Sequence, residues 1–146
     1  MKRKKLATRL VVIGIALALF GLFALLEDWK RDLTTNYAQL DDGASDPSLR
    51  PIVFELSVDE VAARVTQWVE SMPRWEMQSE EQSGDQLQLH LTRRTRVFHF
   101  IDDVYVQLSE QDGGTRLDAE SRSRIGKGDL GQNPKNLREL TRALRL

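Results

Sequence analysis

Hydrophobic and polar residues follow three different patterns along this chain, and each pattern predicts a different kind of element. Residues 10–26 form an apolar run without a single charged side chain. Between 58 and 72 the apolar residues recur every three or four positions, which is the period of an amphipathic helix. From 75 to 123 apolar and polar residues alternate, which is typical of strands with one covered face. The patterns therefore predict one apolar helix followed by a small mixed domain.

The first helix of the mixed domain has both a start signal and a stop signal. Ser57 and Glu60 have the spacing of a capping box. Pro73 lacks a backbone donor and would end the helix after Met72. We therefore predict a helix over 58–72 that packs one face on the strands that follow it.

A second helix is predicted near the C-terminal end. Asn133 suits the N-cap position, and Pro134 suits the first helical position. The residues that follow carry a one-sided apolar stripe, formed by Leu137, Leu140 and Leu144.

The alternating region predicts four antiparallel strands, at 75–80, 87–91, 104–108 and 115–123. Asp112-Gly113-Gly114 is a hairpin signal between the last two strands. The predicted fold class is therefore α+β: an N-terminal transmembrane helix, then a small domain of order helix–four antiparallel strands–helix, with both helices on one face of the sheet.

The apolar run predicts the topology of the chain. Five cations precede it, namely Lys2, Arg3, Lys4, Lys5 and Arg9. The positive-inside rule then places the N-terminus in the cytoplasm and the rest of the chain outside the inner (plasma) membrane. Bulky leucines at the expected cleavage position favour an uncleaved signal anchor over a signal peptide. We predict a basic tail (1–9), a transmembrane segment (10–29), an acidic flexible linker (30–49) and an extracytoplasmic domain (50–146). Gly14 and Ala18 have a small-xxx-small spacing that would permit a weak homodimer.

The charge balance changes when the N-terminal cations are set apart. The whole chain has 21 Lys and Arg against 22 Asp and Glu, a net charge of −1. Without the five cations, 16 remain against 22 acidic residues, a net charge of −6 for residues 10–146. An acidic domain has no electrostatic footprint for nucleic acid. The absence of cysteine excludes disulfides, thiolate catalysis and cysteine-ligated metals.

Two charged segments are the candidates for a ligand or partner surface. One, residues 93–103, runs from Arg93 and Arg94 to the adjacent carboxylates Asp102 and Asp103. The other, residues 121–133, precedes the C-terminal helix. The second contributes Arg122, Arg124, Gly126, Lys127, Asp129, Gly131 and Asn133. Glycine-rich backbone ahead of a helix can present N–H groups to a carboxylate or phosphate. The alternative is structural: the arginines pair with acidic residues across the sheet, and the glycines only serve turns.

Other candidates for chemistry are weaker. His90 and His99 lack helical metal-ligand spacing, and His99 as a general base is less favoured than a half-buried strand histidine. In an extended strand, Asp102 and Asp103 would point to opposite faces, so they make a poor acid/base pair. The sequence predicts no catalytic residue, no metal site and no cofactor.

The charged segments carry a resemblance to a known family. The run Phe98-x-Phe100-x-Asp102-Asp103-Val104, followed by Ser121-x-Ser123-Arg124-Ile125-Gly126-x-x-Asp129-Leu130-Gly131-x-Asn133, resembles domain-of-unknown-function family 1499. The resemblance covers about residues 47–146 and includes Arg50-Pro51-Ile52-x-Phe54. It implies no activity. The residues that it assigns to the family's motif are Asp102, Asp103, Arg124, Gly126, Asp129, Gly131 and Asn133. The cysteine that many members carry early in the domain is missing here.

Three classes of function remain open. The first is a membrane-anchored, non-enzymatic binding or scaffold domain that uses the surface from Arg122 to Asn133 for a small anion or an envelope protein. The second is a structural subunit of an envelope complex. The third is an enzyme of unknown reaction, which is least favoured because no nucleophile–base pair or metal-ligand set is apparent.

Overall fold

The computed structural model describes residues 9, 11–17, 20–21, 34–96 and 99–145 of the chain. Between 34 and 145 its elements are β1 (Tyr37–Gln39), the 3-10 helix η1 (Pro47–Leu49), β2 (Ile52–Phe54), α3 (Val58–Ser71), β3 (Trp75–Ser83), β4 (Gln86–Arg94), β5 (Ile101–Gln111), β6 (Gly114–Ser123) and α4 (Gln132–Leu144). This part of the chain is a sheet-rich α+β domain.

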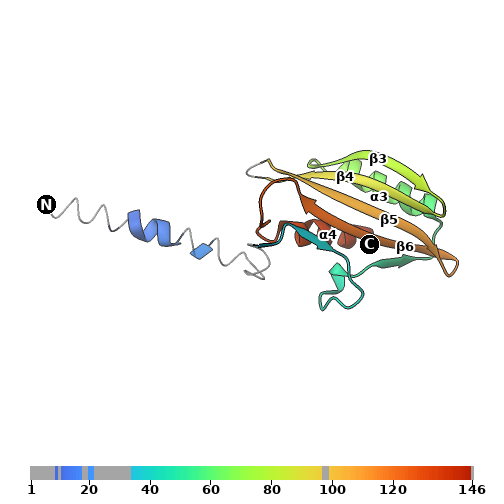
Figure 1. The fold of residues 1–146 in the computed structure, drawn as a ribbon, viewed down its shortest axis with the longest axis horizontal. Helices are drawn as coiled ribbons and strands as arrows, with labels where there is room; N and C mark the ends of the chain where they lie inside the picture. Colours follow the sequence, from blue (N-terminus) through green and yellow to red (C-terminus); the bar gives the residue numbers. More distant parts are fainter. Residues whose placement is uncertain (1–8, 10, 18–19, 22–33, 97–98, 146) are drawn as a thin grey trace.

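One antiparallel sheet contains all six of these strands. The strand order is β1-β6-β5-β4-β3, and β2 also pairs with β6. β1 pairs with residues 120–122 of β6, and β2 pairs with residues 115–117, so two short strands share one edge. Figure 1 shows α3 and α4 on the same side of this sheet, where they contact both the strands and each other. The opposite side, here called the outer face, is not covered by either helix.

The core lies between the sheet and the two helices. Every second residue of β4, β5 and β6 points toward the helices, because successive strand side chains point to opposite faces. These side chains meet the apolar stripes of α3 and α4, and none of the following is more than 3% exposed: Val61, Val65, Val69, Leu87, Leu89, Leu91, Val104, Val106, Leu108, Leu117, Leu137, Leu140 and Leu144. Burial of each such side chain stabilises the fold by roughly 1.5–3 kcal/mol.

The start signal of the first helix is confirmed. Ser57 Oγ accepts a hydrogen bond from the Glu60 backbone N–H at 3.3 Å, and Glu60 Oε2 accepts one from the Ser57 N–H at 2.9 Å. α3 ends at Ser71, with Met72 as its C-cap immediately before Pro73.

The predicted transmembrane helix is wrong for the residues that the structure describes. None of their helices is long and apolar enough to cross a membrane. The described helical run at 11–17 would rise only about 10 Å, whereas a hydrocarbon core is about 30 Å thick. Apart from residues 20–21, the rest of 10–29, including Ala18 of the small-residue pair, lies outside the described residues, as does almost all of the tail 1–9. The extracytoplasmic location stays a prediction.

The prediction of four strands is also wrong, because β1 and β2 join the sheet. Both have only three residues, which is too short to show an alternating period.

β1 and η1 lie within the stretch predicted as a flexible linker (30–49). That stretch is attached to α4 by polar contacts: Asp46 accepts hydrogen bonds from the Ser48 backbone N–H at 2.9 Å and from Arg138 Nε at 2.7 Å. The Thr141 hydroxyl donates to the Ser48 carbonyl oxygen at 2.6 Å.

Candidate functional site

The adjacent carboxylates of β5 lie on opposite faces of the sheet, as the strand pleat predicted. Asp102 is on the helix-covered face and is 1% exposed. Asp103 is on the outer face, where it contacts His90 and Arg124. The two residues therefore belong to different sites.

Asp102 is part of a buried hydrogen-bond network. Its carboxylate accepts hydrogen bonds from Ser123 Oγ at 2.7 Å and from Asn136 Nδ2 at 2.9 Å. The Asn136 amide also donates to Ser121 Oγ at 3.1 Å. Because a buried polar group is costly unless it is hydrogen-bonded, these contacts hold α4 in one position on β5 and β6.

Asn133 connects this network to the segment before β1. The side chain is fully buried; its Oδ1 accepts from Ser121 Oγ at 2.6 Å, and its Nδ2 donates to the Asn36 carbonyl oxygen at 2.8 Å. The network therefore joins α4, β6 and the start of β1.

The N-terminus of α4 is occupied by a carboxylate of the protein itself. Asp129 Oδ1 accepts from the Gly131 N–H, and Oδ2 accepts from the Asn133 N–H, both at 2.9 Å. The N-cap is Gly131, with a φ of 75°, so the predicted N-cap role of Asn133 is wrong. Its side chain is used in the network instead. The backbone N–H groups predicted to hold an external anion thus already hold Asp129.

The surface predicted from Arg122 to Asn133 therefore divides into two parts. Its buried members are Asp102, Asp129, Gly131 and Asn133. Its exposed members are Arg122, Arg124, Gly126 and Lys127, and Asp103 lies between the two classes. The Arg122 guanidinium lies over the Tyr37 ring, 5.3 Å from its centroid. Only the exposed part can meet a ligand.

On the outer face, Asp103 joins an arginine to a histidine. Arg124 donates from Nε to Asp103 Oδ2 at 2.8 Å and from an Nη to Oδ1 at 2.7 Å. His90 Nε2 lies 2.8 Å from the same Oδ1, and its ring is stacked on Tyr105 at a centroid distance of 4.6 Å. The hydrogen bonds from Arg124 lower the pKa of Asp103. Burial raises it by less, and the hydrogen bond with His90 lowers it further. The pair raises the pKa of Arg124 in turn.

This lowered pKa predicts an acid-sensitive contribution to stability. The folded domain binds fewer protons at Asp103 than the unfolded chain does, so the contribution is present above the usual aspartate pKa and is lost as the pH falls through the folded value. Asp103→Asn is expected to cost roughly 1 kcal/mol of unfolding free energy at pH 7. Urea unfolding at pH 7 and at pH 3 should show this difference shrinking in acid. The control, Asp85→Asn in the exposed β3–β4 turn, should change the free energy of unfolding at neither pH. An equal loss for Asp103→Asn at pH 7 and at pH 3 would contradict the prediction.

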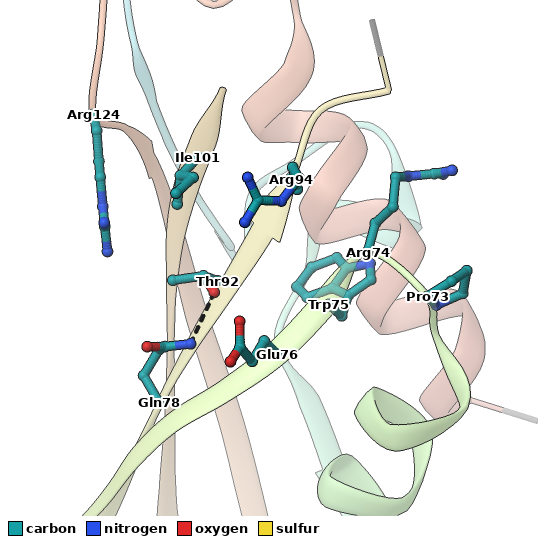
Figure 2. Close-up of a pocket in the computed structure, with 9 residues that line it drawn as sticks. All are labelled: Pro73, Arg74, Trp75, Glu76, Gln78, Thr92, Arg94, Ile101 and Arg124. Carbon is teal, nitrogen blue, oxygen red and sulfur yellow. Dashed lines mark hydrogen bonds between the residues drawn. The ribbon is translucent and has the colours of Figure 1, made fainter. Parts of the chain in front are cut away.

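A pocket of about 160 Å³ lies on the outer face beside Arg124. Its lining comes from the start of β3, the end of β4 and the adjoining ends of β5 and β6: Pro73, Arg74, Trp75, Glu76, Gln78, Thr92, Arg94, Ile101 and Arg124. Figure 2 shows Arg94 reaching toward the side where Ile101 and Arg124 lie, while the Arg74 guanidinium points away. Gln78 Nε2 donates to Thr92 Oγ1 at 3.1 Å across the floor.

One guanidinium of this pocket is unpaired within the described part of the chain. The Arg94 guanidinium has no hydrogen-bond or ion-pair partner there. Arg74 Nε and Trp75 Nε1 also lack an acceptor among the described residues, but both atoms are closed to solvent, and the Trp75 ring lies against Trp68 of α3. Glu76 is the one carboxylate in the lining, against three guanidinium groups. Elsewhere in the described ranges, no three His, Cys, Asp or Glu residues are grouped so that they could hold a metal ion.

Comparison with known proteins identifies the family. The family model described as Protein of unknown function (DUF1499) matches residues 26–144. The chain belongs to this family. Searches of curated proteins and of solved structures found no match.

The geometry separates the residues of the DUF1499 motif by what they contact. Asp102, Ser121, Asp129 and Asn133 make hydrogen bonds inside the domain. Ser121 donates to Asn133, Asp129 accepts from the Asn133 backbone N–H, and Asp102 accepts from the side chains of Ser123 and Asn136. Arg124 and Asp103 form the outer-face pair beside the pocket.

The sequence placed Arg94 in a candidate segment but did not single it out as a site residue, and it gave no indication of Gln78 or of the pairing of His90 with Asp103. The alternation within each strand places His90, Asp103 and Tyr105 on the polar face of the sheet. His90 is the cross-strand partner of Tyr105, so Asp103, two residues before Tyr105, lies diagonally opposite it. That signal becomes usable only when the β4–β5 register is known.

Proposed function

We propose that this domain is a binding module for a small anionic group, a carboxylate or a phosphate, held between Arg94 and Arg124. The observation that carries the proposal is the Arg94 guanidinium, which lines a pocket without a counter-ion among the described residues. A planar guanidinium matches carboxylate and phosphate oxygens in a bidentate arrangement. The proposal uses the exposed half of the surface predicted from the sequence.

Arg124 would be the second, oriented contact. Its bidentate pair with Asp103 uses Nε and one Nη, which fixes the plane of the guanidinium and leaves the other Nη for a ligand. Thr92 accepts a hydrogen bond from Gln78, so its own hydroxyl hydrogen is available as a donor. The pocket thus presents two cations and neutral donors at positions that the strands determine.

The acidic side chains limit which anions the pocket favours. Asp103 neutralises much of the Arg124 charge, and Glu76 lies in the lining. The remaining positive charge is small, so a singly charged group is expected to bind better than a highly charged one.

The proposal is tested by titrating inorganic phosphate and acetate into the full chain by calorimetry at low ionic strength. Arg94→Gln removes one charge-assisted contact worth about 1.5–3 kcal/mol, so affinity should fall at least tenfold. Arg64→Gln is the matched control, because Arg64 is an exposed arginine of α3 on the opposite side of the sheet. Binding that is unchanged in Arg94→Gln, or equally weakened in both variants, would contradict the proposal.

A further inference from the structure

We infer that a second cavity, on the outer face of the sheet, binds a neutral sugar through Tyr105 and the polar side chains around it. Its volume is about 380 Å³, within the range of roughly 300–1,000 Å³ for small-molecule sites. Its lining shares no residue with the anion pocket at Arg94, so the two sites are independent. The lining residues are Gln39, Leu40, Gln88, Tyr105, Gln107, Asp118, Ala119 and Glu120.

The strand register places the polar lining residues in two neighbouring rows across the sheet. The first row is Gln88, Gln107 and Asp118, and the second is Tyr105, Glu120 and Gln39. Residues directly opposite each other in antiparallel strands point to the same face. Tyr105 is two residues beyond Asp103 in β5 and therefore shares the outer face with it. Both rows thus belong to the face that neither helix covers.

Tyr105 provides an aromatic surface that is held in place from one side. Its ring is stacked on His90 of β4, with centroids 4.6 Å apart and an interplanar angle of 14°. β4 and β6 flank β5 on opposite sides, so the other face of the ring is turned toward β6, where Glu120 lines the cavity. The face of an aromatic ring is electron-rich and attracts the C–H groups on one side of a pyranose ring. A sugar can therefore stack on Tyr105 from the side of β6.

The groups around this ring include both hydrogen-bond donors and acceptors. The Gln88 amide and the Tyr105 hydroxyl have no hydrogen-bond partner within the described ranges. Glu120 Oε2 lies 3.0 Å from the Tyr37 hydroxyl, and the Glu120 carboxylate forms no ion pair in the described part of the chain. The cavity therefore presents an unused amide, hydroxyl and carboxylate within two rows of one sheet.

This mixture distinguishes between classes of ligand. Arg116 Nε is paired with Asp118 at 2.8 Å, but Glu120 keeps its negative charge, which repels an anion. An ammonium group has only donors and would leave the Gln88 N–H groups and the Tyr105 hydroxyl hydrogen without an acceptor. Sugar hydroxyls donate to a carboxylate and accept from an amide, and the C–H side of the sugar suits the aromatic ring. A neutral sugar is thus the ligand class that uses all of these groups.

The test is saturation-transfer NMR of the full chain with maltose, cellobiose and N,N′-diacetylchitobiose. At least one of these disaccharides should bind, and Tyr105→Ala should lower its affinity about fivefold because the stacking is lost. Gln88→Ala removes one neutral hydrogen bond and should lower the affinity about two- to tenfold. The matched control is Gln67→Ala, because Gln67 is an exposed glutamine of α3, on the helix-covered side of the sheet. It should leave the affinity unchanged.

Further variants separate stacking from folding. Tyr105→Phe keeps the ring and should retain most of the binding, and circular dichroism checks that each variant is folded. If Tyr105→Ala does not fold, Gln88→Ala decides the test, because Gln88 is exposed and makes no hydrogen bond within the described ranges. Binding of none of the three disaccharides, or binding that Gln88→Ala leaves unchanged, would overturn the inference. Binding of spermidine in their place, lost in Glu120→Gln, would assign the cavity to an amine and would also overturn it.

The two sites can be tested separately in the same samples. Gln88→Ala should weaken disaccharide binding and leave phosphate binding unchanged, whereas Arg94→Gln should do the reverse. Failure to bind phosphate alone would overturn the proposed function and leave the sugar site in place. Loss of both ligands in either folded variant would contradict the existence of two separate sites.

Discussion

Asn133→Ala is expected to lower the free energy of unfolding by about 3 kcal/mol. The side chain has no solvent exposure and makes contacts to β6 and to the segment before β1. Alanine would leave the Ser121 hydroxyl and the Asn36 carbonyl without these partners. An unsatisfied buried group costs about 1–3 kcal/mol, and the cavity left by the amide adds to the loss.

Urea unfolding followed by tryptophan fluorescence measures this change. The ring centroids of Trp68 and Trp75 lie 4.8 Å apart beside the core, and unfolding separates the two rings. Arg142→Ala on the exposed side of α4 is the control, with an expected change within about 0.5 kcal/mol. In a double-mutant cycle, Ser121→Ala should lower the free energy of unfolding by less in the Asn133→Ala background than in the wild type. Simple additivity would show that the two side chains do not act as one network.

Gly114→Ala is expected to cost roughly 2–3 kcal/mol, for a steric reason. A Cβ at this position would overlap the carbonyl oxygen of Phe54 in β2. That oxygen belongs to a backbone held against β6, where Phe54 pairs with Thr115, so it cannot rotate away as a flexible side chain would. The strand β2 must therefore move, and the largely buried Phe54 ring must move with it.

The neighbouring glycine provides a matched control in the same turn. Gly113 has a φ of 81°, and a Cβ there would meet nothing within 4 Å. Gly113→Ala should therefore incur only the left-handed backbone penalty, about 1–2 kcal/mol. Hydrogen exchange should show faster exchange in β2 for Gly114→Ala but not for Gly113→Ala. Similar exchange in both variants would contradict the close approach of β2 to β6.

These predictions assign most of the family motif to the stability of the fold. The carboxylate of Asp129 fills the helix terminus that a ligand would otherwise use, and Asn133 fastens α4 to the sheet. Only Arg124 and Asp103 connect the motif to the pocket on the outer face. Loss of function in variants of the buried residues should therefore accompany loss of folding, whereas Arg94→Gln should leave the fold intact.

The sequence predicted those elements whose burial is one-sided over many residues. α3, the meander from β3 to β6 and the apolar stripe of α4 all repeat their pattern long enough to be recognised. β1 and β2 are three residues each, and they are strands only because β6 offers them a free edge. The sequence around Asp46 predicts only a turn. Its ion pair with Arg138 could not be predicted, because the two residues are 92 positions apart in the chain.

The same division applies to the candidate site. Strand parity by itself determined that Asp102 and Asp103 point to opposite faces, because the pleat is a local property of the backbone. Parity does not determine which strands are neighbours or in what register they pair. The tertiary structure therefore decided that Arg94 meets Arg124 at one pocket and that Asp129 occupies the N-terminus of α4. Local spacing determines the direction of a side chain, whereas its partner depends on long-range pairing.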